Sequence, residues 1–135
     1  MILSDTGPLV ALINRNDPHH LECKSALEQL PAEPLLVVWP CFVEAMYLLQ
    51  RCGYRAQEVA WQMVLSGHMM LHAPTDAEVR RMAQLMEKYR DVPMDLADAA
   101  AMAAAEQMGM RRIFSLDSDF NIYGTSDGIA LQIVP

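Results

Sequence analysis

Long apolar runs and paired cysteines are both missing from this sequence. No apolar stretch approaches the roughly 18 residues that a membrane-spanning helix needs, and the start MILSD has neither the basic flank nor the apolar length of a signal peptide. The three cysteines are odd in number and form no CxxC motif, which argues against a disulfide framework or a zinc site. We therefore expect a cytoplasmic protein with reduced thiols and no membrane association.

Positive charge is also scarce. Ten Lys and Arg residues stand against 17 Asp and Glu residues, which gives a net charge of −7. Proteins that hold nucleic acid by a broad cationic surface neutralise its phosphates, so this composition argues against that mode of binding. The only two lysines, Lys24 and Lys88, fall within expected helices and away from strand ends.

The remaining composition is that of a globular protein with a substantial apolar core, 53% hydrophobic over 135 residues, and predicts one domain spanning residues 1–135. Short apolar runs bounded by Pro, Gly or acidic residues predict strands at 1–4, 35–39, 69–72, 112–116 and 131–134. Helical patterns fill the intervals, at 7–14, 19–30, 41–52, 54–66, 76–90 and 96–109. This alternation predicts an α/β fold of three layers, with a mainly parallel sheet of about five strands between helices.

Acidic residues recur where this fold would gather them. Asp5 and Asp117 directly follow strands, whereas Glu44 and Asp98 fall in the first turns of helices. Carboxyl ends of parallel strands and amino ends of the following helices lie at the same edge of such a sheet, which is where ligands bind. The four acids should therefore reach one edge, although the strand order that would bring them to one point is left open.

The surroundings of these acids contain no cation. The helical neighbours of Glu44 and Asp98 are apolar or aromatic, and we expect such carboxylates, if buried, to be paired, protonated or bound to metal. Asp95 precedes Asp98 by three residues, as a helix cap does, and Asp5 by itself could also be a cap. Carboxylates gathered without Lys or Arg repel one another unless a cation intervenes, and Mg²⁺ or Mn²⁺ is the expected ion.

Four segments in order resemble the PIN-domain family, and most closely its VapC-type toxins. These segments are SDTGPLVAL, PCFVEAMYLL, PMDLADAAAMAAAEQMG and RIFSLDSDF. The resemblance covers essentially the whole chain and implies a PIN-like three-layer fold with a ribonuclease site that depends on Mg²⁺ or Mn²⁺. It assigns Asp5, Glu44, Asp98 and Asp117 as catalytic and metal-binding residues. Around them it suggests four supporting residues, namely Thr6, Asp95, Ser115 and Asp119.

The resemblance also implies partners. We expect an RNA substrate, a small antitoxin protein and a homodimer, for which the apolar stretch from Tyr54 to Met70 is a candidate contact unless it belongs to the core. Two other readings of the resemblance stay open, a housekeeping RNA-processing nuclease and a PIN-like binding module that has lost turnover. A phosphoaspartate enzyme or receiver domain is disfavoured because those chemistries need a lysine near the site.

Overall fold

The computed structural model describes residues 1–135 and has the predicted α/β architecture. A five-stranded sheet, parallel at every pairing, has the order β3-β2-β1-β4-β5. Its strands are β1 (Ile2–Ser4), β2 (Leu35–Val38), β3 (Met69–His72), β4 (Arg112–Phe114) and β5 (Gln132–Val134). The helices are α1 (Thr6–Ile13), α2 (His20–Gln29), α3 (Trp39–Leu49), α4 (Tyr54–Leu65), α5 (Asp76–Lys88) and α6 (Leu96–Met108), with short 3₁₀ turns η1 (Gln50–Cys52) and η2 (Ser118–Asn121).

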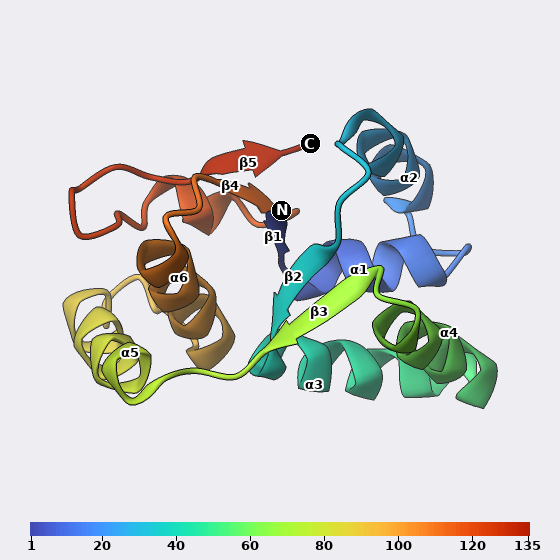
Figure 1. Cartoon of the computed structure of the whole chain (residues 1–135), viewed down its shortest axis with the longest axis horizontal. Coiled ribbons are helices and arrows are strands. Elements are labelled where there is room, and N and C mark those ends of the chain that lie inside the picture. The colour runs from blue at the N-terminus through green and yellow to red at the C-terminus, as the bar shows by residue number, and fades with distance from the viewer.

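Helices cover both faces of the sheet, which confirms the predicted three layers. Figure 1 shows α5 and α6 on one side of the sheet and α1 to α4 on the other. The chain moves outward from β1 to β2 and β3, then returns to place β4 on the other side of β1. Because parallel crossovers are right-handed, this reversal sends the last two helices to the opposite face and creates a topological switch point between β1 and β4.

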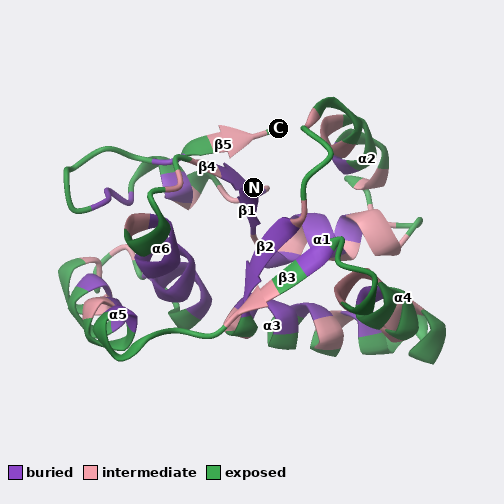
Figure 2. Ribbon diagram, in the orientation of Figure 1, coloured by how far each residue is buried: buried purple, intermediate pink, exposed green.

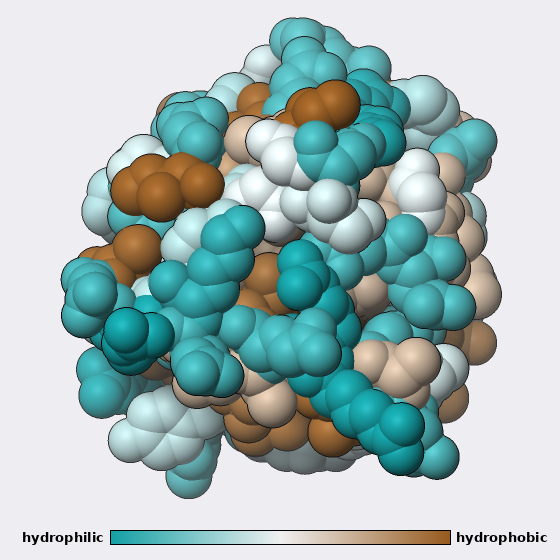
Figure 3. All heavy atoms as spheres, turned by 90° about the vertical axis from the view of Figure 1, so that its left-hand side faces the viewer, coloured by the Kyte–Doolittle hydropathy of each residue, from teal (hydrophilic) through white to brown (hydrophobic).

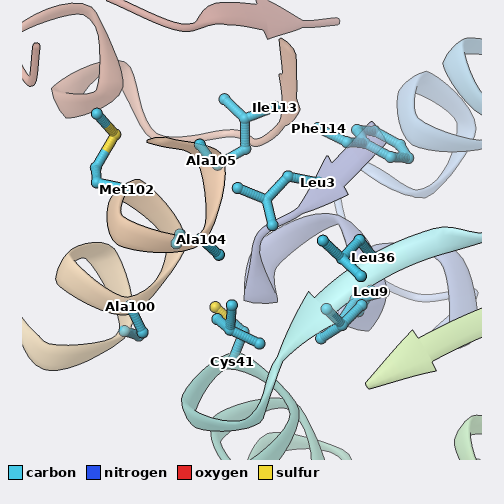
Figure 4. Packing of buried hydrophobic residues seen from close by; sticks show 14 of the residues in the cluster. Leu3, Leu9, Leu36, Cys41, Ala100, Met102, Ala104, Ala105, Ile113 and Phe114 are labelled. Carbon is cyan, nitrogen blue, oxygen red and sulfur yellow. The ribbon is translucent and has the colours of Figure 1, made fainter. Parts of the chain in front are cut away.

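The core lies on both faces of the central strands. Figure 2 shows burial concentrated in β1, β2 and the inner side of α6, while β3, β5 and the outer sides of α4 and α5 are half-buried or exposed. In Figure 4, Leu3 of β1 lies between the alanines of α6 and a pair formed by Leu9 and Leu36. Small residues at the buried positions of α6, such as Ala104 with no exposed surface, allow the helix to lie close to the sheet.

No helix in the structure has the length and apolar character that crossing a bilayer requires. The three cysteines are free, as the sequence predicts.

Candidate active site

The switch point brings Asp5 and Ser115 side by side. Ser4 and Phe114 are paired in the β1–β4 register, and the Asp5 N–H donates to the Phe114 carbonyl at 2.9 Å. One residue further on, the Ser115 hydroxyl donates to Asp5 Oδ2 at 2.9 Å. Asp5 Oδ1 accepts the Thr6 N–H at 2.8 Å, so this carboxylate is also the N-cap of α1. The capping role that the sequence suggested is therefore confirmed, together with a place at the switch point.

Asp117 joins the same corner through Ser115. The Asp117 N–H donates to the Ser115 hydroxyl oxygen at 3.0 Å, while Asp117 Oδ1 accepts the Asp119 N–H at 2.9 Å. Asp117 thus caps η2, and Asp119 supports it through the main chain. Ser115 is buried and links two of the four candidate acids with one hydroxyl.

Glu44 reaches this corner from α3, but it is not buried. Glu44 is exposed. Its Oε2 lies 3.1 Å from the Thr6 hydroxyl, and that hydroxyl also lies 3.3 Å from the Cys41 carbonyl oxygen. The sequence left open whether Glu44 is buried, and the structure shows that it is exposed. The face of α3 that packs into the core carries Cys41, Phe42, Ala45 and Leu49, and Glu44 lies outside it.

Asp98 is the most buried of the four acids, with 7% of its surface exposed. Its N–H donates to Asp95 Oδ1 at 2.8 Å, which confirms Asp95 as the cap of α6. Asp98 Oδ2 accepts a hydrogen bond of 3.0 Å from the Tyr123 hydroxyl. Tyr123 is fully buried and packs edge-on against Tyr89 and Phe120, so the hydroxyl is held in a fixed position.

Two neighbours of the acids were not predicted from the sequence. One is Tyr123, which lies in the segment after η2 and meets Asp98 only through tertiary packing. The other is Cys41, whose buried thiol donates to Asp5 Oδ1 at 3.7 Å. Burial and the nearby Asp5 carboxylate raise the pKa of Cys41, which keeps it a neutral donor.

Burial without a cation raises the proton affinity of two acids. Desolvation raises the pKa of Asp5, with Asp117 adding repulsion against three favourable hydrogen bonds. For Asp98, desolvation followed by repulsion from Asp95 raises the pKa to about 7, although the Tyr123 hydrogen bond opposes the shift. Asp5 and Asp117 also repel Asp98, which places the three carboxylates within one electrostatic neighbourhood.

No lysine or arginine forms an ion pair with any of the four acids. Arg81 instead makes a bidentate pair with Glu106, and Arg111 pairs with Asp127. The four carboxylates offer only hard oxygen donors, which suit Mg²⁺ or Mn²⁺. As the side chains stand, no three of them converge closely enough to enclose an ion. That spacing fits a hydrated ion, because Mg²⁺ keeps several waters and binds through one or two carboxylates.

The fold and site define an α/β protein with an acidic switch-point corner, as the resemblance to PIN domains implied. No protein-family model matches the chain. The chain is 29% identical over 118 residues to Ribonuclease VapC26 of Mycobacterium tuberculosis, covering 86% of each sequence. The crystal structure of VapC20 from Mycobacterium tuberculosis, described as a toxin that cleaves the sarcin–ricin loop, superposes with a TM-score of 0.86 over the full length of both chains at 22% identity.

A toxin–antitoxin complex from Klebsiella pneumoniae also matches, with a TM-score of 0.66 at 24% identity over 89% of this chain and 90% of the other. The sequence similarity to a VapC ribonuclease and the shared fold agree with the resemblance to VapC-type PIN domains that the sequence motifs indicate.

Asp98→Asn should stabilise the metal-free protein, and the gain should grow with pH. With a folded-state pKa of about 7, against about 3.9 in the unfolded chain, Asp98 binds more proton in the folded state and stability falls as pH rises between these values. Asparagine removes this penalty, which is about 4 kcal/mol at most above pH 7, and can still accept from Tyr123. Urea unfolding in EDTA at pH 5, 6.5 and 8 would measure the trend.

The matched control is Glu58→Gln, which removes an acid from the exposed face of α4 and should leave the pH profile of stability in place. An Asp98→Asn gain that is the same at pH 5 and pH 8 would contradict the burial of a proton-binding carboxyl at this position.

Proposed function

We propose that this protein is a ribonuclease that depends on Mg²⁺ or Mn²⁺ and hydrolyses RNA phosphodiester bonds as the toxin of a toxin–antitoxin pair. The observation that carries the proposal is that four carboxylates from four elements lie around the β1–β4 switch point with no cationic partner. The similarity to Ribonuclease VapC26 supports the choice of RNA as substrate. The expected cytoplasmic location follows from such a substrate.

In this proposal Asp5, Glu44, Asp98 and Asp117 would hold the hydrated metal, either directly or through its bound waters. When bound, the ion would activate a water molecule and neutralise charge on the scissile phosphate. The protein contributes orientation: Ser115 and Cys41 aim the two oxygens of Asp5, Thr6 restrains Glu44, and Tyr123 restrains Asp98. Such supporting hydrogen bonds fix ligand geometry and are costly to remove. Asp95 and Asp119 act through the main chain, by capping and by supporting Asp117.

The exposed apolar residues of α4 support a homodimer. Tyr54, Trp61 and Leu65 expose between 39% and 83% of their surface, and Ala60 is the only buried residue of this helix. The core explains part of the apolar stretch, because Ala60 and Met69 are buried and Met63 and Val64 pack against it, but it does not explain these exposed residues. We place the dimer contact on α4 and the adjoining edge strand β3, where Met70 is also exposed.

The rate of RNA cleavage should fall by at least about a hundredfold in each of the variants Asp5→Asn, Glu44→Gln and Asp98→Asn. Loss of a group that only supports a metal ligand lowers activity about ten- to a hundredfold, and loss of the ligand itself should lower it at least as much. Asp117→Asn should act in the same direction but more weakly. The control Asp95→Asn should cleave nearly normally, since asparagine caps a helix about as well as aspartate. Rates on a labelled RNA in Mg²⁺, with melting temperatures to confirm folding, would measure this. Full activity in any of the first three would remove that residue from the site.

Mg²⁺ or Mn²⁺ should raise the melting temperature relative to EDTA, because an ion that binds only the folded state stabilises it. The shift should be larger at pH 8 than at pH 6, since Asp98 must release a proton to act as a ligand. It should vanish in the Asp5→Asn/Asp98→Asn double variant. Thermal scans at both pH values provide the measurement, and identical curves with and without EDTA would argue against a metal site.

We further propose that a small antitoxin, encoded beside this protein, blocks the site by placing an Arg or Lys among the four acids. An uncompensated acidic cluster favours such an insertion through charge-assisted hydrogen bonds. Expression of the chain alone should slow growth of its host, and co-expression of the neighbour should restore it. The Asp5→Asn and Asp98→Asn variants should be harmless without the neighbour. If the wild-type chain is harmless alone and no small partner copurifies, a housekeeping nuclease becomes the better assignment.

A further inference from the structure

A series of contacts leads from the end of α5 to Asp98. Tyr89 is the C-cap of α5, and its ring packs edge-on against the ring of Tyr123 with centroids 5.2 Å apart. The Tyr123 hydroxyl in turn donates to Asp98 Oδ2 at 3.0 Å. Tyr89 itself forms its side-chain hydrogen bond with Gly124 and not with any of the four acids, so the proposed metal site does not account for it directly.

The hydroxyl of Tyr89 holds the segment that carries Tyr123. It accepts the N–H of Gly124, the next residue along the chain, at 2.8 Å. Gly124 is buried, and a Cβ added there would lie 3.3 Å from the main chain of Gly128, so little room is left for this segment to move. Because a buried N–H without a partner is costly, the hydrogen bond to Tyr89 determines where the main chain beside Tyr123 lies.

The main chain of Tyr89 holds the segment that leads to Asp98. The Tyr89 carbonyl accepts the N–H of Val92 at 3.0 Å and the N–H of Met94 at 3.2 Å. This connection runs directly into Asp95, the cap of α6, and so into Asp98 in the first turn of that helix. One residue therefore anchors both the segment that supplies the hydroxyl and the segment that supplies the carboxylate.

The surroundings of the two tyrosine rings leave them little freedom. Tyr89 packs against the core, and the Lys88 ammonium lies 5.1 Å from its ring centroid. Tyr123 is fully buried and also packs edge-on against Phe120. In a close-packed interior, a shift of the main chain at Gly124 cannot be absorbed by a new rotamer of Tyr123. Such a shift would instead move the Tyr123 hydroxyl away from Asp98.

We propose that Tyr89 is a positioning residue for Asp98, which acts through the main chain of Gly124 and the hydroxyl of Tyr123. The inference rests on the proposed function, in which Asp98 is a metal ligand, and adds to it a residue that controls metal affinity without touching the site. Without the Tyr89 hydroxyl, the Gly124 N–H has to reach water, which displaces Tyr123 and leaves the Asp98 carboxylate free to rotate.

The variant Tyr89→Phe tests the proposal, because it keeps the ring and removes only the hydroxyl. Affinity for Mn²⁺, measured at one pH by electron paramagnetic resonance of the free ion, should fall by about three- to tenfold. This is less than the roughly ten- to a hundredfold expected when Tyr123→Phe removes the partner of Asp98 directly. In RNA cleavage, the Mn²⁺ concentration for half-maximal rate should rise by the same factor, while the rate at saturating Mn²⁺ stays near that of the wild type. A purely structural role would lower the melting temperature without this split.

A double-variant cycle tests whether Tyr89 acts through Tyr123. In the Tyr123→Phe background, Tyr89→Phe should change Mn²⁺ affinity by less than about twofold, because the hydroxyl that Tyr89 positions is already gone. Urea unfolding in EDTA provides the same test without metal. The combined effect of the two substitutions on the unfolding equilibrium constant should be at least about twofold smaller than the product of their separate effects.

The matched control is Thr125→Val, in the residue that follows Gly124. Thr125 is buried and its hydroxyl donates to the Ile129 carbonyl at 3.0 Å, so valine removes a hydrogen bond from the same segment without removing one from Tyr89 or Asp98. This variant should melt at a lower temperature and bind Mn²⁺ as the wild type does. An equal loss of Mn²⁺ affinity in Thr125→Val would assign the effect to general order of the segment and overturn the role of Tyr89.

Failure of this proposal can be told apart from failure of the proposed function. If the wild type binds Mn²⁺ and Tyr89→Phe binds it equally well, or if the two substitutions act independently, the positioning role is wrong and the metal site remains. If the wild type binds no Mn²⁺, the proposed function is wrong. Coupling between Tyr89 and Tyr123 in EDTA would then still support the positioning of Asp98, and its absence would overturn it.

Discussion

The hydrogen bond from the Asp5 N–H to the Phe114 carbonyl joins β1 to β4 at their carboxyl ends, and the position of the whole site depends on this pairing. If the register shifted by one residue, Ser115 could no longer bridge Asp5 and Asp117, since side chains would turn to opposite faces. The pairing exists because the chain winds outward first and then returns on the other side of β1. The strand order alone therefore brings Asp5 and Asp117 close together.

Bringing like charges to that point has an energetic cost that the fold limits in three ways. Asp98 is kept partly protonated near neutral pH by its burial, which relieves repulsion with Asp5 and Asp117. Hydroxyl, thiol and main-chain donors, rather than cations, satisfy the Asp5 oxygens. Glu44 stays exposed, where water screens its charge. A salt bridge to one of these acids would also offset the repulsion, but its cation would occupy the place of the proposed metal ion. The face over α5 and α6 is mostly hydrophilic, with small hydrophobic clusters (Figure 3). Unlike the four acids, Glu106 of α6 has a cationic partner, because it forms an ion pair with Arg81 of α5.

The elements were predictable from sequence because their signals are local. Strand and helix ends differ from expectation by one or two residues, apart from the end of α3, where η1 takes over. Asp95 was recognisable as a cap from its spacing alone. The exposure of Glu44 was not predictable, because α3 is apolar both on its core face and on its exposed face, where Trp39, Val43 and Tyr47 lie. The sequence pattern therefore does not reveal which side of this helix is buried. Tyr123 carries no local signal for Asp98, since 25 residues separate them and only packing brings them together. The strand order was beyond reach for the same reason.

The scarcity of cations raises the question of how this acidic protein could bind a polyanion such as RNA in the proposed function. Counterion release, the usual source of nucleic-acid affinity, requires cations, but the ten Lys and Arg of this chain are outnumbered by 17 acids, and Arg81 and Arg111 are paired with two of these. In the proposed function, metal ions at the acidic corner would supply part of the affinity for phosphate. This contribution would depend on the divalent ion and on the protonation of Asp98. The acidic corner would thus control when the substrate is held for cleavage, because Asp98 must lose its proton before the metal can bind there.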